Sequence, residues 1–251
     1  MRLKPVALVG AGVGIAGAAA LAANSAPSLV ALSWLGRHLA PNLAGVGIPG
    51  HVALTFDDGP DDASTPKFLE TLDELGLRAT FFMLGDMARR APGLAADVAA
   101  AGHEVAVHGD RHRSQLRLAP GTVADDIARA RDAVADATGV EPLWFRPPYG
   151  TLSLSGLLAA RRVGLRTVLW TAWGRDWRAE ATPESVVDDV LDGFVDGGTV
   201  LLHDSDCTSA PRSWQATLGA LPALASELDA RSLRVGPVGE HGIPRPDPVA
   251  A

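Results

Sequence analysis

Short apolar segments alternate with amphipathic segments along most of this chain. Residues 51–56 (HVALTF) and 79–84 (ATFFML) have the length and the β-branched or aromatic content of buried strands. Between them, residues 65–75 place apolar side chains at helical spacing and stop at Gly76. The chain therefore begins its main region with a strand, a helix and a second strand.

The same alternation continues to about residue 235. Further strands are expected at 104–107, 143–145, 167–170, 199–202 and 233–235. Helices are expected at 92–101, 122–138, 153–163, 183–195 and 214–230. Strands that alternate with helices predict a mostly parallel sheet, either as an open doubly wound sheet or as a barrel.

A separate apolar segment precedes this region. Arg2 and Lys4 stand before residues 6–23, which carry no charge and consist largely of Ala, Gly and aliphatic residues. A basic start followed by an apolar run predicts an export signal or a membrane anchor, with a buried N-terminal helix as the alternative. We therefore expect a signal peptide or anchor with its linker at 1–40, the α/β domain at 50–240 and a disordered tail at 241–251.

Composition narrows the classes of function. The formal net charge is −7 and no run rich in Lys or Arg occurs, which argues against nucleic acid as a partner. The single cysteine, Cys207, excludes an intrachain disulfide and a Cys-rich zinc site. Any metal must therefore be held by His and carboxylate side chains. The sequence does not indicate an oligomeric state.

Ionisable residues follow five of the predicted strands. The carboxyl ends of parallel strands meet at one edge of a sheet or one mouth of a barrel, so these residues are expected to lie together. In chain order the segments are Asp57-Asp58-Gly59-Pro60, His108-Gly-Asp-Arg-His112, Arg146-Pro-Pro-Tyr149, Asp176-Trp177 and His203-Asp204.

One carboxylate and two imidazoles among them form a candidate set of metal ligands. Adjacent carboxylates at Asp57 and Asp58 repel unless a cation or a proton lies between them, although the same four residues also favour a turn. His108 and His112 have the i,i+4 spacing that suits two imidazoles on one cation, the alternative being that His112 is a surface residue. Zn²⁺ is the default ion, and Co²⁺, Ni²⁺ or iron accept the same ligands.

The other strand-end residues suit the hydrolysis of an amide. A metal-bound water needs a base, for which Asp57 is placed, and an amide leaving group needs an acid, which His203 can supply. Arg146 can hold a carboxylate ionised, and a backbone N–H beside Tyr149 can serve an oxyanion. The structural alternatives are an ordinary salt bridge for Arg146 and a hydrogen-bonded histidine for His203.

Together these segments resemble the polysaccharide deacetylase family, also called the NodB-homology domain or carbohydrate esterase family four. The resemblance covers roughly residues 52–235. The segments that carry it are Thr55-Phe-Asp-Asp-Gly59, His108-Gly-Asp-Arg-His112, Arg146-Pro-Pro-Tyr149, Gly174-Arg-Asp176-Trp177 and Leu201-Leu-His203-Asp204.

The resemblance implies a fold and a role for each site residue. The fold is expected to be α/β, a distorted (β/α)7-type barrel preceded by a hydrophobic N-terminal helix. The divalent metal, Zn²⁺ or alternatively Co²⁺ or Ni²⁺, is expected on Asp58, His108 and His112. The expected catalytic residues are Asp57 as base, Arg146 as its orienting partner, His203 as acid and Asp176 as the group that tunes it. The expected substrate-binding residues are Tyr149 at the oxyanion and Trp177, Leu201 and Trp173 on the pocket wall.

Two positions depart from the family pattern. Gly109 stands where the second motif usually has Ser or Thr, which removes a hydroxyl but keeps both imidazoles. Trp173 stands where the fourth motif often has Asp, three residues before Asp176. We expect Trp173 to make the cleft narrower or more apolar and to alter substrate preference while every chemical role stays filled.

The function implied is removal of N-acetyl groups from a glycan that contains N-acetylglucosamine, either peptidoglycan or chitin-like oligomers. The domain is then expected to act outside the cytoplasm, secreted or tethered to a membrane by the N-terminal segment. One alternative is a deacylase of the same fold that acts on another amide or on an O-acetyl ester. Another is a glycan-binding module without catalysis.

Overall fold

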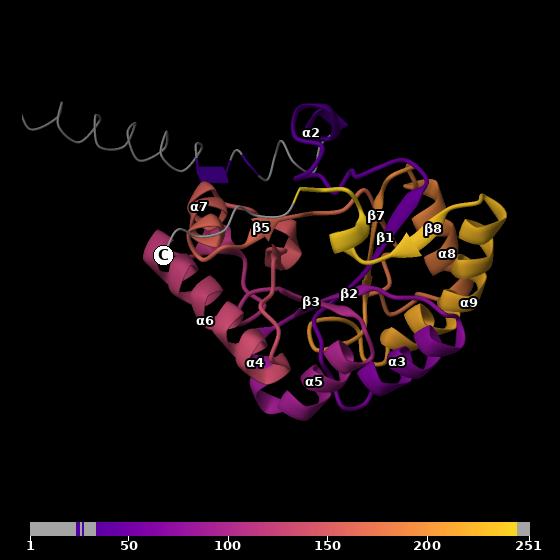
Figure 1. Cartoon of the computed structure of the whole chain (residues 1–251), viewed down its shortest axis with the longest axis horizontal. Coiled ribbons are helices and arrows are strands. Elements are labelled where there is room, and N and C mark those ends of the chain that lie inside the picture. The colour runs from indigo at the N-terminus through magenta and orange to yellow at the C-terminus, as the bar shows by residue number, and fades with distance from the viewer. Residues whose placement is uncertain (1–23, 26, 28–33, 245–251) are drawn as a thin grey trace, which may run out of the picture.

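The computed structural model describes residues 24, 25, 27 and 34–244. Its parallel strands form one curled sheet in the order β5-β4-β3-β2-β1-β7-β6, with β8 also paired to β1, and helices cover the outside (Figure 1). This arrangement confirms the α/β class and the distorted barrel, which stays open between its end strands β5 and β6. The expected hydrophobic N-terminal helix lies outside the described residues.

The strands match the predicted positions except near residue 170. Their bounds are β1 His51–Asp57, β2 Thr80–Met83, β3 Glu104–Val107, β4 Trp144–Phe145, β5 Arg166–Thr167, β6 Ala172–Trp173, β7 Thr199–His203 and β8 Arg234–Gly236. The single strand predicted at 167–170 is wrong, because β5 ends at Thr167 and β6 follows it. The chain leaves the sheet between them, where the carbonyls of Val168 and Leu169 accept hydrogen bonds from the Arg146 guanidinium.

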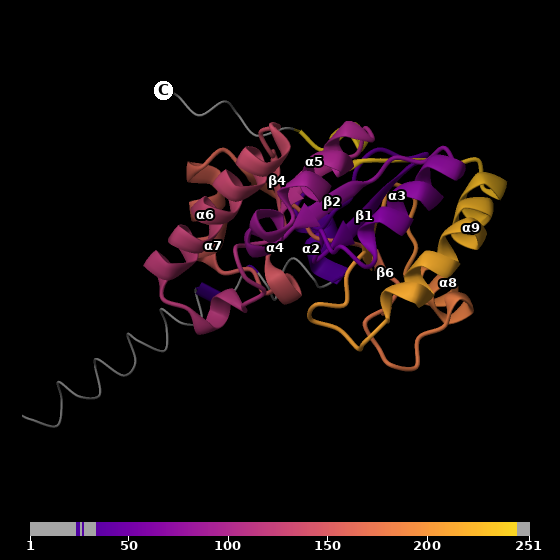
Figure 2. The same cartoon turned by 90° about the horizontal axis from the view of Figure 1, so that it is seen from below.

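The helices lie on the outside of the sheet. Their bounds are α2 Trp34–Leu39, α3 Thr65–Glu74, α4 Gly85–Arg90, α5 Pro92–Ala100, α6 Pro120–Thr138, α7 Leu154–Arg162, α8 Pro183–Asp192 and α9 Trp214–Ala230, with single turns at η1 Gln115–Arg117, η2 Pro148–Gly150 and η3 Val238–Glu240. In both views α6 and α7 lie on one side and α8 and α9 on the other (Figures 1 and 2). The six-residue α4 was not predicted, because it is too short to show a helical period.

Strand β1 is buried along its full length, and its side chains alternate between two environments. Leu54 and Phe56 join the large core under the helices, where the Phe56 ring packs edge-on against Phe68 of α3. Thr55 and Asp57 point the other way and both contact Arg146. The pleat of one strand thus separates the core from the site.

The strand register brings the polar segments together. Asp57 pairs with His203 of β7 and with Phe82 of β2. Val107 of β3 pairs with Phe145 of β4, so the residues that follow them, His108 and Arg146, are neighbours. The expected meeting of strand ends is therefore a direct result of parallel pairing.

The described C-terminal residues pack against the fold. His241 and Ile243 are buried, and the backbone carbonyl of His241 accepts a hydrogen bond from the Ile48 N–H. Residues 241–244, placed with the tail in the sequence analysis, thus pack against the α/β domain; 245–251 lie outside the described part. Among the helices that are described, none is both long enough and apolar enough to cross a membrane.

Glu104 ties together three strands and the C-terminal turn. Its carboxylate accepts hydrogen bonds from the indole N–H of Trp144 at 2.8 Å, the hydroxyl of Thr80 at 2.7 Å and the backbone N–H of Gly239 at 3.0 Å. Trp144 is fully buried. One side chain therefore satisfies donors from β2, β4 and η3.

Replacing Glu104 should therefore destabilise the fold. Glu104→Ala leaves a buried indole N–H without an acceptor and is expected to lower the free energy of unfolding by about 3 kcal/mol. Glu104→Gln keeps an acceptor and should cost less than half as much. Urea unfolding measures both variants, and equal losses would show that the hydrogen bonds are not responsible.

Candidate functional site

A pocket of about 270 Å³ lies at the carboxyl ends of the strands. It is lined by Asp57, His108, His112, Tyr149, Gly150, Trp170, Trp173, Trp177, Leu201, His203, Thr208 and Ser209. Three more residues of the predicted site, Asp58, Arg146 and Asp176, are buried behind this lining. The structure thus brings all the predicted site residues to one place.

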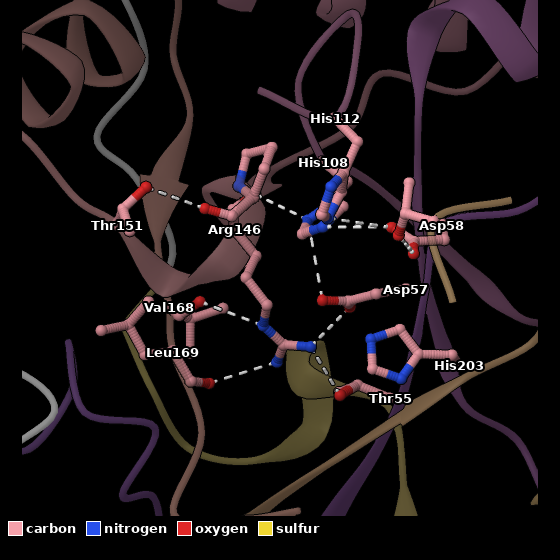
Figure 3. Close-up of polar contacts among 12 residues, drawn as sticks. Thr55, Asp57, Asp58, His108, His112, Arg146, Thr151, Val168, Leu169 and His203 are labelled. Atoms are coloured by element: carbon pink, nitrogen blue, oxygen red, sulfur yellow. Dashed lines mark hydrogen bonds and ion pairs between the residues drawn. The ribbon is translucent and has the colours of Figure 1, made fainter. Parts of the chain in front are cut away.

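Asp57 is held by a buried arginine. The Arg146 Nη1 lies 2.7 Å from Asp57 Oδ1 and also donates to the Thr55 hydroxyl at 2.8 Å (Figure 3). Both Asp57 and Arg146 are almost completely buried. Burial raises the pKa of Asp57 to about 6, although the Arg146 charge opposes the rise. Asp57 can therefore act as a base near neutral pH, and it becomes protonated when the pH falls below about 6.

Asp58 faces away from this ion pair because of its backbone. Its φ of 82° is in the left-handed region, which only a few non-glycine residues adopt readily. Its Oδ1 lies 3.4 Å from the Nε2 of His108 and 3.4 Å from the Nε2 of His112 (Figure 3). Its Oδ2 accepts a hydrogen bond of 2.6 Å from Thr208. The two adjacent carboxylates thus share one neighbour, His108, whose Nδ1 lies 3.6 Å from Asp57 Oδ2, but Asp57 is bonded to Arg146 whereas Asp58 faces the Nε2 atoms of both imidazoles.

The Asp58, His108 and His112 atoms fit one divalent metal ion. One ligand atom from each residue lies within 4.8 Å of the others, and Asp58 Oδ1 is buried with no hydrogen-bond partner among the described residues. Ligands at about 2.0–2.1 Å from a tetrahedral ion are about 3.4 Å apart, which matches the two O–N distances. A set of two imidazoles and one carboxylate also leaves a coordination position for water or substrate.

The two imidazoles are prepared to be ligands. His108 Nδ1 is 2.9 Å from the carbonyl oxygen of Arg146, so it donates there and leaves Nε2 unprotonated toward Asp58. Burial holds the pKa of His108 well below its usual range and lowers the pKa of His112 as well. Both rings are therefore neutral at pH 7, as a metal ligand must be.

His203 stands across the pocket with a buried aspartate behind it. Its Nδ1 is 2.8 Å from Asp176 Oδ1, and its backbone N–H donates to Asp176 Oδ2. Thr217 of α9 donates a third hydrogen bond to the same carboxylate. Burial is the largest single influence and lowers the pKa of His203, but the charge and hydrogen bond of Asp176, together with the charges of Asp58 and Asp57, outweigh it and raise that pKa to about 10. His203 is therefore a protonated imidazolium that can give up a proton.

Aromatic side chains form one wall of the pocket. The Trp170 and Trp173 rings are stacked with centroids 6.0 Å apart, and Trp173 meets Trp177 at 5.0 Å. Trp177 in turn contacts the His203 ring edge-on at 5.9 Å, and Leu201 lines the same pocket. An apolar wall beside the acid–base groups can receive a methyl group or the face of a sugar ring.

The two departures from the family pattern have local explanations. Gly109 has a φ of 90°, and the loop it begins is fixed by Asp126, which accepts the backbone N–H of Asp110 at 2.9 Å. Trp173 lies on the pocket wall, while the guanidinium of Arg146 uses backbone carbonyls as its further acceptors. Neither change removes a partner from Asp57 or Asp58.

Several hydroxyl groups that hold the site were not predicted. They are Thr208 on Asp58, Thr217 on Asp176, and Thr65, which donates to the buried carboxylate of Asp204. Each is far in sequence from its partner, and threonine is common in loops and helices. The only available signal was that Thr208 follows closely after the segment of His203 and Asp204.

Comparison with known proteins extends these observations. The polysaccharide deacetylase family profile matches residues 46–168. The chain is 36% identical to the peptidoglycan-N-acetylglucosamine deacetylase PgdA of Listeria monocytogenes over 70% of its own length, but this match spans only 37% of that protein. It is 35% identical to a chitooligosaccharide deacetylase of Bradyrhizobium over 74% of its own length and 88% of the relative.

A solved structure shows the same fold. The family 4 carbohydrate esterase from Streptomyces lividans, determined in complex with acetate, superposes with a TM-score of 0.68 at 32% identity. The match covers 79% of this chain and 98% of the esterase. The order of the motifs, the open barrel and these similarities lead to one conclusion: the chain belongs to the polysaccharide deacetylase family.

Proposed function

We propose that this protein is a metal-dependent hydrolase that removes N-acetyl groups from a glycan containing N-acetylglucosamine. The observation that carries the proposal is the separation of the two adjacent aspartates. Asp57 is fixed by Arg146 and opens into the pocket, while Asp58 faces His108 and His112. Glycan binding alone requires neither a buried base nor a paired acid, so this arrangement favours catalysis over the binding-module alternative.

The chain's own residues supply base, acid and oxyanion contact. Asp57 takes a proton from the attacking water as the water oxygen bonds to the amide carbon. His203 gives a proton to the amide nitrogen as the C–N bond breaks, which releases acetate and leaves an amine on the sugar. The backbone N–H of Tyr149, a residue held at a φ of 59°, is proposed to donate to the developing oxyanion.

The divalent ion is proposed to be Zn²⁺, with Co²⁺ or Ni²⁺ as substitutes. When bound to Asp58, His108 and His112, the ion would act as a Lewis acid and lower the pKa of a water molecule bound to it. Trp177 and Leu201 are proposed to enclose the acetyl methyl, because both line the pocket beside His203. Trp173 is proposed to set substrate preference from the same wall.

The place of action is proposed from the relatives and the N-terminus. Peptidoglycan, the substrate in the name of the Listeria relative, lies outside the cytoplasm. Residues 1–40 are accordingly proposed to be an export signal or membrane anchor with its linker, which leaves the catalytic domain at 50–240 extracytoplasmic.

Activity should depend on Asp57. The zinc-loaded protein is expected to release acetate from N-acetylglucosamine oligomers or from peptidoglycan, and Asp57→Asn should lower kcat by about 10²–10⁴-fold because the base is lost. Acetate is measured with a coupled assay, and thermal unfolding verifies that the variant is folded. Release only from O-acetyl esters or other amides would move the assignment to the alternative deacylase.

Metal binding should depend on Asp58 and not on Asp57. Asp58→Asn suits the positive φ, removes the charge and is expected to weaken zinc or cobalt binding by at least about 100-fold. Asp57→Asn is the matched control and should bind within a few-fold of the unmodified protein. Titration calorimetry on the metal-stripped proteins compares them, and equal affinity of the Asp58 variant would contradict the ligand assignment.

The pH at which kcat/KM falls on the alkaline side should depend on the charge of Asp176. Its charge favours the imidazolium of His203, so Asp176→Asn lowers the pKa of His203 and the acid is lost at lower pH. The alkaline limb of kcat/KM is expected to move down by at least about one pH unit. Thr217→Val removes a hydrogen bond to Asp176 but no charge, so it should move the alkaline limb of kcat/KM less. An unmoved limb in Asp176→Asn would exclude His203 as the acid.

A further inference from the structure

A second hollow adjoins the catalytic pocket. Its volume is about 580 Å³, and it is lined by His112, Arg113, Ser114, Arg117, Leu118, Tyr149 and Thr151. His112 and Tyr149 also line the catalytic pocket, so the two hollows share a wall. A glycan that places one sugar in the catalytic pocket can therefore reach this hollow with a neighbouring group.

The hollow is basic in a protein that is acidic overall. The formal net charge of the chain is −7, yet Arg111, Arg113 and Arg117 lie within seven residues beside His112. Arg117 is exposed and its side chain forms no ion pair or hydrogen bond with any described residue, and the same is true of Arg111. The lining contains no carboxylate. Arg111 lies outside this lining, so the guanidinium in the hollow that is available to an external anion is that of Arg117.

Arg113 adds a guanidinium to the same wall. Its Nη2 is bound to Asp126 at 2.6 Å, which fixes the guanidinium, and its Nε is buried, so Arg113 contributes positive charge to the hollow but no free Nε donor. The hydroxyls of Ser114 and Thr151, 3.0 Å apart, line the same hollow, but Thr151 donates to the carbonyl of Pro148, so these hydroxyls are bonded within the chain. The exposed guanidinium of Arg117 remains available, and a guanidinium is a typical partner of a carboxylate.

We propose that this hollow is a subsite for a carboxylate carried by the sugar or side chain next to the acetylated sugar. The inference rests on the proposed deacetylase function and narrows its substrate to an acidic glycan, as opposed to a neutral chitin-like oligomer. The carboxylate of a lactyl ether on the neighbouring sugar and that of an attached peptide share this chemistry. Arg117 is the specificity-determining residue, because its guanidinium has no internal partner.

The test measures binding and not turnover. Zinc-loaded protein with Asp57→Asn, which stops hydrolysis in every arm, is titrated with three ligands: N-acetylglucosaminyl-N-acetylmuramic acid, its carboxamide, and the same disaccharide carrying a dipeptide with a free carboxylate. The acid is expected to bind about 5-fold more tightly than the carboxamide, and the preference should shrink as salt is added. Tighter binding of the dipeptide ligand than of the acid would place the carboxylate on the peptide.

Substitutions then locate the contact. Arg117→Ala should reduce the acid-to-carboxamide preference to about 1, and Arg117→Lys should keep part of it. Arg161→Ala is the matched control, because Arg161 is an exposed arginine in the last turn of α7. The acid-to-carboxamide preference of the Arg161→Ala variant should equal that of the parent protein.

Three results would overturn the subsite. They are equal affinities for acid and carboxamide in the parent, a preference that survives Arg117→Ala, and no measurable binding of any acidic ligand. Acetate release by the zinc-loaded protein without substitutions is measured separately on neutral oligomers. If the protein releases acetate but binds acid and carboxamide equally, only the proposed subsite is wrong. If it prefers the acid but releases acetate from no glycan, only the proposed deacetylase function is wrong.

Discussion

The buried ion pair between Asp57 and Arg146 is the interaction on which the site depends. Both groups are removed from water, and a buried charge without its partner costs about 3–5 kcal/mol. Arg146 therefore fixes which way Asp57 points, and its remaining donors bond to the carbonyls of Val168 and Leu169, which lie between β5 and β6. The segment between β5 and β6 is thus hydrogen-bonded to the same guanidinium that holds the proposed base, Asp57.

This constraint separates two residues of identical chemistry. Asp57 is extended and part of β1, whereas Asp58 adopts a left-handed backbone that turns its carboxylate to His108 and His112. Burial and Arg146 together place the pKa of Asp57 near 6, while Asp58 has no hydrogen-bond donor on its Oδ1 in the described structure. One aspartate is prepared to exchange a proton and the other to bind a cation.

Much of the fold and the meeting of the strand ends followed from the sequence, because strand ends are marked by abrupt changes from apolar to ionisable residues. Asp57 and His203 were predicted to meet for that reason, and the register pairs them directly. The contacts of Thr208 and Thr217 could not be predicted, since they join a loop and a helix to distant strands. The end of β5 at Thr167 could not be predicted either, because a distant guanidinium competes for the carbonyls that follow it.

Anomalous diffraction at the zinc edge from crystals of the metal-loaded protein tests the division between the two aspartates most directly. One peak is expected within coordination distance of Asp58 Oδ1 and the Nε2 atoms of His108 and His112, with Asp57 still bonded to Arg146. A peak coordinated by Asp57, or no peak between these three residues, would contradict the assignment of base and ligand.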